Sequence, residues 1–213
     1  MMLEIKNLSV GVLKNISLFV GVGARALLRG ANGSGKTTLA NAIIGIVDVP
    51  AKSGRIFFNG ADITDLSIDA RGRAGIFLGA QNVPEIPGLS IMTFLKHSFI
   101  AHYGDVPVNV FMKKLKSAQE RLCIPDAWLG RSVNIGFSGG EKKRIMFLHL
   151  LIIAPKFAIL DEPDSGADES ARKLFGEIII EMKDTTFLVI SHQRQFFRPT
   201  AEITLQGGEI IAK

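Results

Sequence analysis

The chain has 213 residues, of which 47% are apolar and 21% charged, so its composition excludes a largely disordered protein and fits one domain. A net charge of +5 suits anionic ligands, but the basic residues are scattered and do not by themselves predict a nucleic-acid partner. The single cysteine, Cys123, excludes an internal disulfide bond. The most apolar stretch, residues 145–160, contains His149, Pro155 and Lys156 and is shorter than the ~20 residues that a bilayer requires. With no signal segment at its start, the chain is expected to be cytoplasmic, without direct insertion into a membrane.

Hydrophobic patterning predicts strands and helices that alternate along the chain. Short β-branched runs come first, and a glycine-rich loop then leads into a helix predicted from Lys36 to about Ile44. In chain order the predicted elements are strands at 3–8, 16–20 and 24–29, the helix from Lys36, a hairpin-like segment at 55–60, a strand at 75–80, helical segments within 90–122, a helix from about 140 to 154, a strand at 157–160, a helix at about 169–182, a strand at 187–190 and a closing hairpin at 201–212. This alternation favours an α/β fold with a mostly parallel sheet.

The hydrophobic pattern changes from strand-like to helix-like after residue 82, and this change predicts the domain organisation. Pro84, Pro87 and Gly88 interrupt the strand pattern, and helical spacing then dominates to about residue 150. We therefore expect a single domain over residues 1–213. Its α/β core would comprise residues 1–82 and 151–213, with a helical lobe inserted at 83–150.

Residues 30–37 read GANGSGKT between a predicted strand and a predicted helix, the context in which this pattern forms a phosphate-binding loop. Glycines let backbone N–H groups approach phosphate oxygens, Lys36 can reach the β- and γ-phosphates, and the Thr37 hydroxyl can bind Mg²⁺. A glycine-rich turn with an incidental lysine is the structural alternative. We predict that a nucleoside triphosphate is bound by Gly30, Asn32, Gly33, Ser34, Gly35, Lys36, Thr37 and Thr38.

The segment FAILDEP, residues 157–163, is an apolar strand that ends in two carboxylates. At the carboxyl end of a buried strand, Asp161 can hold Mg²⁺, and Glu162 can act as the general base for the water that attacks the γ-phosphate. Two acids in a solvated turn would be the alternative if this segment stood alone. Its position after the phosphate loop favours a catalytic role for Glu162.

The segment FSGGEKKR, residues 137–144, precedes a predicted helix. Ser138, Gly139 and Gly140 would place free N–H groups and a hydroxyl at a helix N-terminus, which makes a second anion site, although a helix cap with flexible glycines is the alternative. The segment resembles the signature of the ABC ATPases, typically LSGGQ. In that family two subunits pack head to tail, and each ATP lies between the phosphate loop of one subunit and the signature of the other. The resemblance implies an enzyme that hydrolyses ATP with Mg²⁺ and binds a second copy of itself.

Further motifs of the ABC ATPases occur in the expected order. Gln81 follows the strand at 75–80 and matches the glutamine that contacts Mg²⁺ and the attacking water. The sequence SGAD, residues 165–168, resembles the loop at the dimer interface, which implies that Asp168 belongs to the nucleotide site. His192 matches the histidine that contacts the γ-phosphate. The resemblance implies the nucleotide-binding fold of this family: a mostly parallel RecA-like core, an antiparallel β subdomain and an inserted helical lobe.

Longer segments resemble one branch of the family, the ATPase subunit of the SUF iron–sulfur cluster assembly machinery (the SufC family). They are LGAQNVPEIPGLS (78–90), RSVNIGFSGGEKKR (131–144) and LDEPDSGADES (160–170). This resemblance implies a soluble ATPase that binds SUF scaffold subunits. The alternatives are the nucleotide-binding subunit of an ABC transporter and an ATP-gated clamp that bridges DNA. The clamp would need long heptad coiled coils, which the sequence lacks.

Two local features bear on ligand and partner. The loop at residues 9–15 has no aromatic residue to stack on adenine, as most ABC ATPases have, and this predicts weak base discrimination. After Gln81, five apolar residues lie among prolines and could either dock a scaffold subunit or pack inside the lobe. These residues are Ile86, Leu89, Ile91, Met92 and Phe94.

Overall fold

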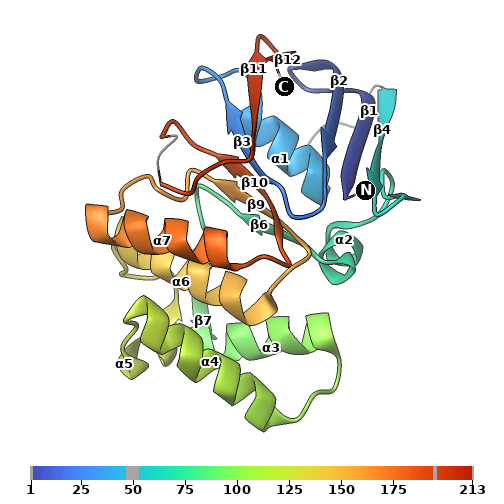
Figure 1. The fold of residues 1–213 in the computed structure, drawn as a ribbon. Helices are drawn as coiled ribbons and strands as arrows, with labels where there is room; N and C mark the ends of the chain where they lie inside the picture. Colours follow the sequence, from blue (N-terminus) through green and yellow to red (C-terminus); the bar gives the residue numbers. More distant parts are fainter. Residues whose placement is uncertain (1, 47–52, 194–195, 213) are drawn as a thin grey trace.

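The computed structural model of the protein describes residues 2–46, 53–193 and 196–212, and its central feature is a six-stranded sheet (Figure 1). Neighbouring strands of this sheet are parallel, except that β12 pairs antiparallel with β11 at one edge. Strands β9 and β10 are buried at every position, as expected for apolar parallel strands that are covered on both faces. The spatial order is β12 (Glu209–Ala212), β11 (Ala201–Gln206), β3 (Arg25–Arg29), β10 (Thr186–Ile190), β9 (Phe157–Asp161) and β6 (Ile76–Gly79).

A second, antiparallel sheet lies beside the first and supplies the predicted β subdomain. Its strands in spatial order are β2 (Leu13–Val20), β1 (Leu3–Val10), β4 (Ser53–Phe58) and β5 (Ala61–Asp62). Helix α1 (Lys36–Ile44) joins the two sheets, because its buried residue Leu39 belongs to one apolar cluster with Leu3 of β1 and Phe157 of β9. The bounds of α1 agree with those predicted from the sequence.

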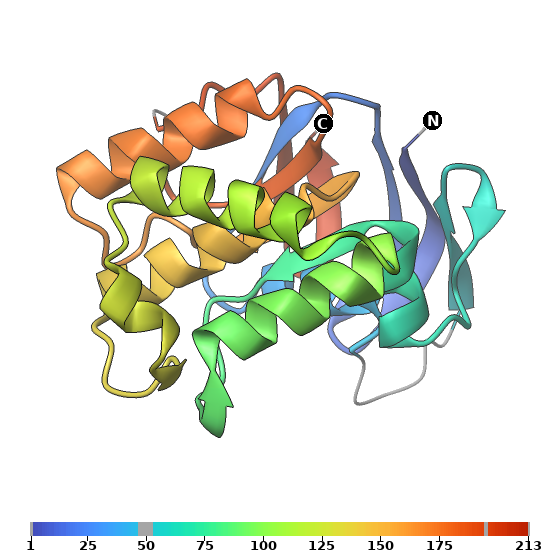
Figure 2. The same ribbon diagram turned by 90° about the horizontal axis from the view of Figure 1, so that it is seen from below.

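Helices α3, α4 and α5 form the lowest part of the molecule in Figure 1, with α6 and α7 above them. In the view from below (Figure 2), α3 and α4 cover α6, and both helices contact it. The pattern that predicted helical spacing is confirmed in α4, where Phe111, Leu115 and Leu122 are buried on one face. The helices are α2 (Ile68–Ala74), α3 (Ile91–Tyr103), α4 (Val108–Leu122), α5 (Asp126–Leu129), α6 (Gly139–Ile153) and α7 (Glu169–Glu181).

A short two-stranded sheet, which the sequence did not predict, pairs the segment before α3 with the segment after α5. Strand β7 (Ile86–Ser90) pairs antiparallel with β8 (Ser132–Val133), with Ile86 opposite Val133. The chain therefore leaves for α3 and returns from α5 at neighbouring points. Helix α6 crosses the predicted boundary at residue 150, so the division of the domain into core and lobe stays a prediction.

The five apolar residues after Gln81 favour packing inside the lobe over docking of a scaffold subunit, the two expectations stated for them. Ile91 is buried, and the other four are half-buried and pack against the same apolar cluster. None of the five is exposed. The fold thus uses these side chains inside the lobe, and they do not form an open apolar surface.

Candidate functional site

An open cleft of about 670 Å³ gathers most of the residues that the sequence singled out. They reach it from the phosphate loop, from the end of β6, from the end of β9 and from the segment after β10. Val12, in the turn between β1 and β2, also lines the cleft and was not among the predicted site residues. The lining residues are Val12, Asn32, Gly33, Gly35, Lys36, Thr37, Thr38, Gln81, Glu162 and His192.

The phosphate loop depends on glycine at two positions. Gly35 forms the N-cap of α1 with φ 107°, a conformation that L side chains rarely adopt. A Cβ atom at Gly30 would collide with the backbone oxygen of Leu205 in β11. The loop can therefore press its backbone against β11 and turn sharply into α1, whose first N–H groups then open into the cleft.

Lys36 holds a positive charge at the mouth of this loop. Its side chain is only 8% exposed, and Nζ donates hydrogen bonds to the backbone oxygens of Gly30 at 2.8 Å and Ala31 at 3.0 Å. Two neutral carbonyl groups orient the ammonium without neutralising it, so its charge remains available to an anion in the cleft.

Thr37 lines the cleft and contacts Asp161, which is buried behind it and does not line the cleft itself. Thr37 Oγ1 donates to Asp161 Oδ2 at 2.9 Å, and Asp161 is 3% exposed at the end of β9. Burial raises the pKa of this carboxyl, and the hydrogen bond from Thr37 opposes that rise. A hydroxyl beside a buried carboxylate is a donor set that Mg²⁺ accepts together with phosphate oxygens and water, so these residues fit the ion.

Glu162 has an unusual backbone conformation, with φ 49° in a residue other than glycine. Such a conformation costs on the order of 1 kcal/mol or more and often marks a functional position. A hydrogen bond from its backbone N–H to Ile190 O, at 2.9 Å, secures it to β10. The carboxylate accepts a hydrogen bond from Gln81 Nε2 at 2.7 Å, and His192 Nε2 lies 3.6 Å from its other oxygen.

Lys143 is a residue of this region that sequence reasoning missed. It lies in the first turns of α6, is 6% exposed, and its Nζ has no hydrogen-bond partner among the described residues. Burial lowers the pKa of this ammonium, and three carboxylates oppose the shift, those of Asp161, Glu162 and Asp164. The sequence gave no sign that Lys143 would be buried near these carboxylates. Lys142 is its neighbour in the chain, and only their positions around the axis of α6 decide which of the two lysines points inward.

The second predicted anion site lies apart from the cleft, because Ser138, Gly139 and Gly140 do not line it. Ser138 is the N-cap of α6 and forms a capping box with Glu141: the Ser138 N–H donates to Glu141 Oε2 at 2.7 Å. A Cβ at Gly140 would lie 3.7 Å from Gly166 O, so the start of α6 is next to the SGAD segment. Within one chain this end of α6 faces no phosphate loop of its own.

Asp168 also acts as a cap in the structure. Its Oδ1 accepts hydrogen bonds from Ala171 N and Ser170 Oγ, both at 2.7 Å, at the start of α7. The backbone hydrogen bond from Ala171 is the main cause that lowers the pKa of this carboxyl. Like Ser138, Asp168 does not line the cleft, so the structure does not bring it to the phosphate loop of the same chain.

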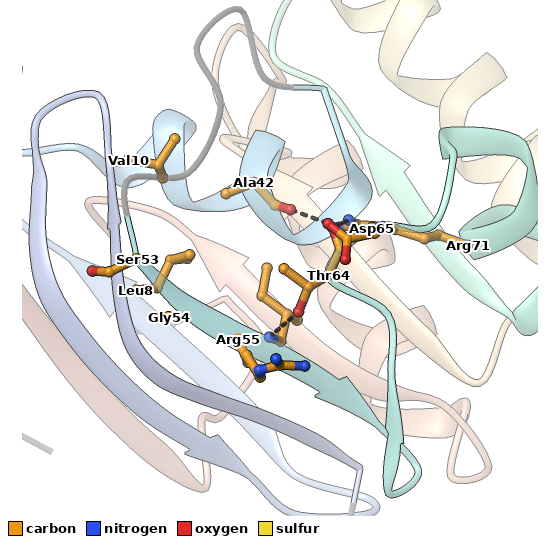
Figure 3. A pocket seen from close by; sticks show the side chains of 10 residues that line it. Leu8, Val10, Ala42, Ser53, Gly54, Arg55, Thr64, Asp65 and Arg71 are labelled. Carbon is orange, nitrogen blue, oxygen red and sulfur yellow. Dashed lines mark hydrogen bonds between the residues drawn. The ribbon is translucent and has the colours of Figure 1, made fainter.

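A second cavity, of about 380 Å³, lies between β1, β4 and the end of α1 (Figure 3). None of the predicted site residues lines it. Arg71 lies at its edge, and its buried guanidinium donates to four backbone oxygens, among them those of Ala42 and Ile43 in the last turn of α1. Arg71 therefore satisfies carbonyl groups that a helix end leaves open, which is a structural role.

No group of three or more His, Cys, Asp or Glu side chains in the described part of the chain is arranged to hold a metal ion. Likewise, no helix within residues 2–46, 53–193 and 196–212 combines the length and the apolarity that crossing a membrane demands.

Comparison with known proteins identifies the class of this molecule. The model of the family described as ABC transporter matches residues 13–165, and the chain belongs to this family as an ABC-type ATPase. The probable ATP-dependent transporter SufC of Escherichia coli is 35% identical over 99% of this chain and 91% of its own length. A probable ATP-dependent transporter of Synechocystis sp. is 39% identical over 98% and 88%, and a probable ABC transporter ATP-binding protein of Streptococcus pyogenes is 36% identical over 98% and 87%.

Solved structures show the same fold. A dimeric bacterial ABC transporter cassette matches 99% of this chain and 97% of its own with a TM-score of 0.87 at 21% identity. A dimeric post-hydrolysis state of the same cassette, bound to ADP and phosphate, gives a TM-score of 0.83 at 22% identity over the same shares. The expected fold, a RecA-like core with an antiparallel β subdomain and a helical insertion, is thereby confirmed.

Proposed function

We propose that this chain is the ATP-hydrolysing subunit of a SUF iron–sulfur cluster assembly machinery, and that two copies close head to tail around two ATP molecules. The proposed dimer is supported by one observation: the two anion-binding segments of a single chain lie apart from each other. The phosphate loop opens into the cleft, whereas Ser138, Gly139 and Gly140 begin α6 elsewhere. A second copy, turned head to tail, supplies the signature that each cleft lacks.

In this proposal each side chain of the cleft has one task. Backbone N–H groups of the phosphate loop and the Lys36 ammonium bind the β- and γ-phosphates. The Glu162 carboxylate accepts the proton of the attacking water, and its strained backbone, tied to β10, fixes the direction of the carboxylate. Gln81 and His192, which flank that carboxylate, hold the water and contact the γ-phosphate.

Thr37 and Asp161, with Gln81, would hold Mg²⁺ in this site. When bound, the ion neutralises phosphate charge in the transition state. The protein prepares for it by keeping Thr37 Oγ1 and Asp161 Oδ2 at 2.9 Å from each other, with the carboxylate withdrawn from solvent. Asp168 would act at the interface between the two copies, because its loop lies next to the start of α6.

Similarity to SufC over nearly the whole chain supports the assignment to the SUF machinery. Parts of two of the three segments that carry the resemblance also lie together, since EIPG (85–88) lies in and next to β7, RSVN (131–134) lies in and next to β8, and the two strands pair. SUF scaffold subunits are the expected partners. The second candidate is the ATP-binding subunit of an ABC transporter, favoured by the names of several relatives, which are described as transporter components.

The partners of the chain in its native extract test this proposal. Glu162→Gln protein, tagged and loaded with ATP, would be recovered and its partners compared with those of the ADP-loaded protein. We expect soluble SUF scaffold subunits in the ATP-loaded sample. Recovery of an integral membrane subunit, without scaffold subunits, would establish the transporter candidate instead.

A further inference from the structure

Asn134 joins two segments that have different functions in the proposed dimer. It follows β8 in a left-handed conformation, with φ 62°, and is 4% exposed. Its Nδ2 donates to the backbone oxygen of Pro84 at 2.9 Å. Pro84 lies three residues after Gln81, and Asn134 lies four residues before Ser138. One buried amide therefore connects the segment after Gln81 to the segment that leads into the signature.

Other contacts strengthen the same connection. Lys142, in the first turns of α6, forms an ion pair of 2.8 Å with Glu85. The N–H of Gly88 donates to Ser132 Oγ at 3.2 Å, within the β7–β8 sheet. Together with the Asn134 hydrogen bond, these contacts join residues 84–88 to residues 132–142.

The path from Asn134 to Ser138 is also held in place. Arg131 Nη2 donates to the backbone oxygens of Ile135 at 3.2 Å and Gly136 at 2.9 Å. The guanidinium carbon of Arg131 lies 3.6 Å from the centre of the Phe137 ring, a cation–π contact. Arg131 thus holds two backbone oxygens and one ring of the stretch that runs from Asn134 to Ser138.

We propose that Asn134 is a positioning residue that couples the two ATP sites of the dimer. The inference rests on the proposed head-to-tail arrangement, in which Gln81 contacts the ATP of its own cleft and Ser138 contacts the ATP of the partner's cleft. A shift of Gln81 on binding ATP is carried through Pro84 and Asn134 to Ser138. Asn134 itself touches neither nucleotide, and its effect is on how one site responds to the other.

The test is Asn134→Gly, which removes the bridge and keeps a residue that accepts positive φ. Asn59→Gly is the matched control, because Asn59 is also left-handed, with φ 50°, but lies in the exposed turn after β4. ATP hydrolysis would be measured against ATP concentration, with ATP affinity measured separately on the dilute subunit. We expect Asn134→Gly to lower kcat at least fivefold and the Hill coefficient to about 1, with affinity within twofold of wild type. Asn59→Gly should behave as wild type. A folded Asn134→Gly protein with wild-type kcat and Hill coefficient would overturn the proposal.

The ion pair gives a second route if Asn134→Gly does not fold. Lys142→Glu should lower kcat, and adding Glu85→Lys should restore it, because the reversed pair re-forms the contact. No loss in the single variant, or no recovery in the double variant, would overturn the coupling. The dimer itself is checked with Glu162→Gln protein that retains Asn134: if ATP does not dimerise it, the proposed function fails, whereas dimerisation together with unchanged cooperativity in Asn134→Gly rejects the coupling alone.

Discussion

Gln81 and Glu162 are 81 positions apart in the sequence, and a hydrogen bond of 2.7 Å joins their side chains. Each follows one of two neighbouring parallel strands, β6 and β9, so the sheet brings the two residues to the same edge. The amide of Gln81 donates, which leaves the second oxygen of Glu162 near His192. The two neighbouring side chains thus orient the carboxylate of Glu162.

Replacing Glu162 with Gln should lower the rate of ATP hydrolysis by ~10²–10⁴-fold, because an amide keeps the shape of the side chain but accepts no proton. ATP binding should be unchanged, and an ATP-bound dimer should accumulate. Phosphate release and sedimentation velocity measure the two effects. Glu177→Gln, on the exposed face of α7, is the matched control. A turnover number within a factor of two of wild type would rule out Glu162 as the base.

Two inactive variants should complement each other. Lys36→Ala removes the ammonium that binds phosphate and should weaken ATP binding, whereas Ser138→Arg should spare ATP binding by the monomer and block hydrolysis in the dimer. A heterodimer of the two has one site with both an intact phosphate loop and an intact signature. Phosphate release should therefore return in the mixture. Confirmed heterodimers that remain inactive at every mixing ratio would contradict shared sites.

Val12 lies at the cleft where a stacking aromatic is expected, and it is 52% exposed. Without a ring at this position, GTP should compete with ATP within about tenfold. Val12→Tyr should tighten ATP binding by ~1–3 kcal/mol, the range found for base–aromatic stacking. Competition with a fluorescent ATP analogue measures both. If wild type already prefers ATP strongly, another residue supplies the contact with the base.

His149 makes the stability of the fold sensitive to acid. Its ring packs edge-on against Phe77 and Phe94, with centroid distances of 5.1 and 4.8 Å, and burial lowers the pKa of His149 from 6.5 to about 4. Between these two pH values the unfolded chain binds the proton more readily than the folded protein does. The contribution of neutral His149 to the free energy of unfolding is therefore fully present above pH 6.5 and is lost as the pH falls toward 4. At pH 5 the loss should be about 2 kcal/mol.

Urea unfolding at pH 7 and pH 5 measures this loss. Comparison with His149→Gln isolates it, because the other titrating groups are common to both proteins. We expect the free energy of unfolding to fall more steeply in wild type than in His149→Gln. Equal slopes in the two proteins would mean that the His149 ring is protonated without cost in the folded state.

The phosphate loop and the acidic strand end could be predicted because their chemistry is local. A strand, a glycine-rich loop and a helix follow one another in sequence, and α1 begins at Lys36, as predicted, directly after the loop. The burial of β9 is likewise visible in its uninterrupted apolar residues. Gln81 and His192 required the family resemblance, because a single polar residue after a strand has no pattern of its own.

The parts that were missed depend on contacts between distant segments. Strand β8 has two residues, and its pairing with β7 joins positions more than 40 residues apart, so neither strand has a periodicity to detect. Helix α2 has only seven residues and contains Gly72, which disfavours a helix locally, and Arg71 anchors it to the end of α1. Lys143 gains its significance from carboxylates on other elements.

The β7–β8 pairing has a consequence for chain length. The polypeptide enters α3 after Ser90 and returns from α5 to β8 at Ser132, and these two serines are partners in the sheet. Because its two ends are paired, the segment between Ser90 and Ser132 can become longer or shorter without changing the distance between these two residues. The exposed pair Gly104 and Asp105, between α3 and α4, is therefore a suitable place to insert a reporter peptide or a small domain, with Gln81 and the phosphate loop left undisturbed.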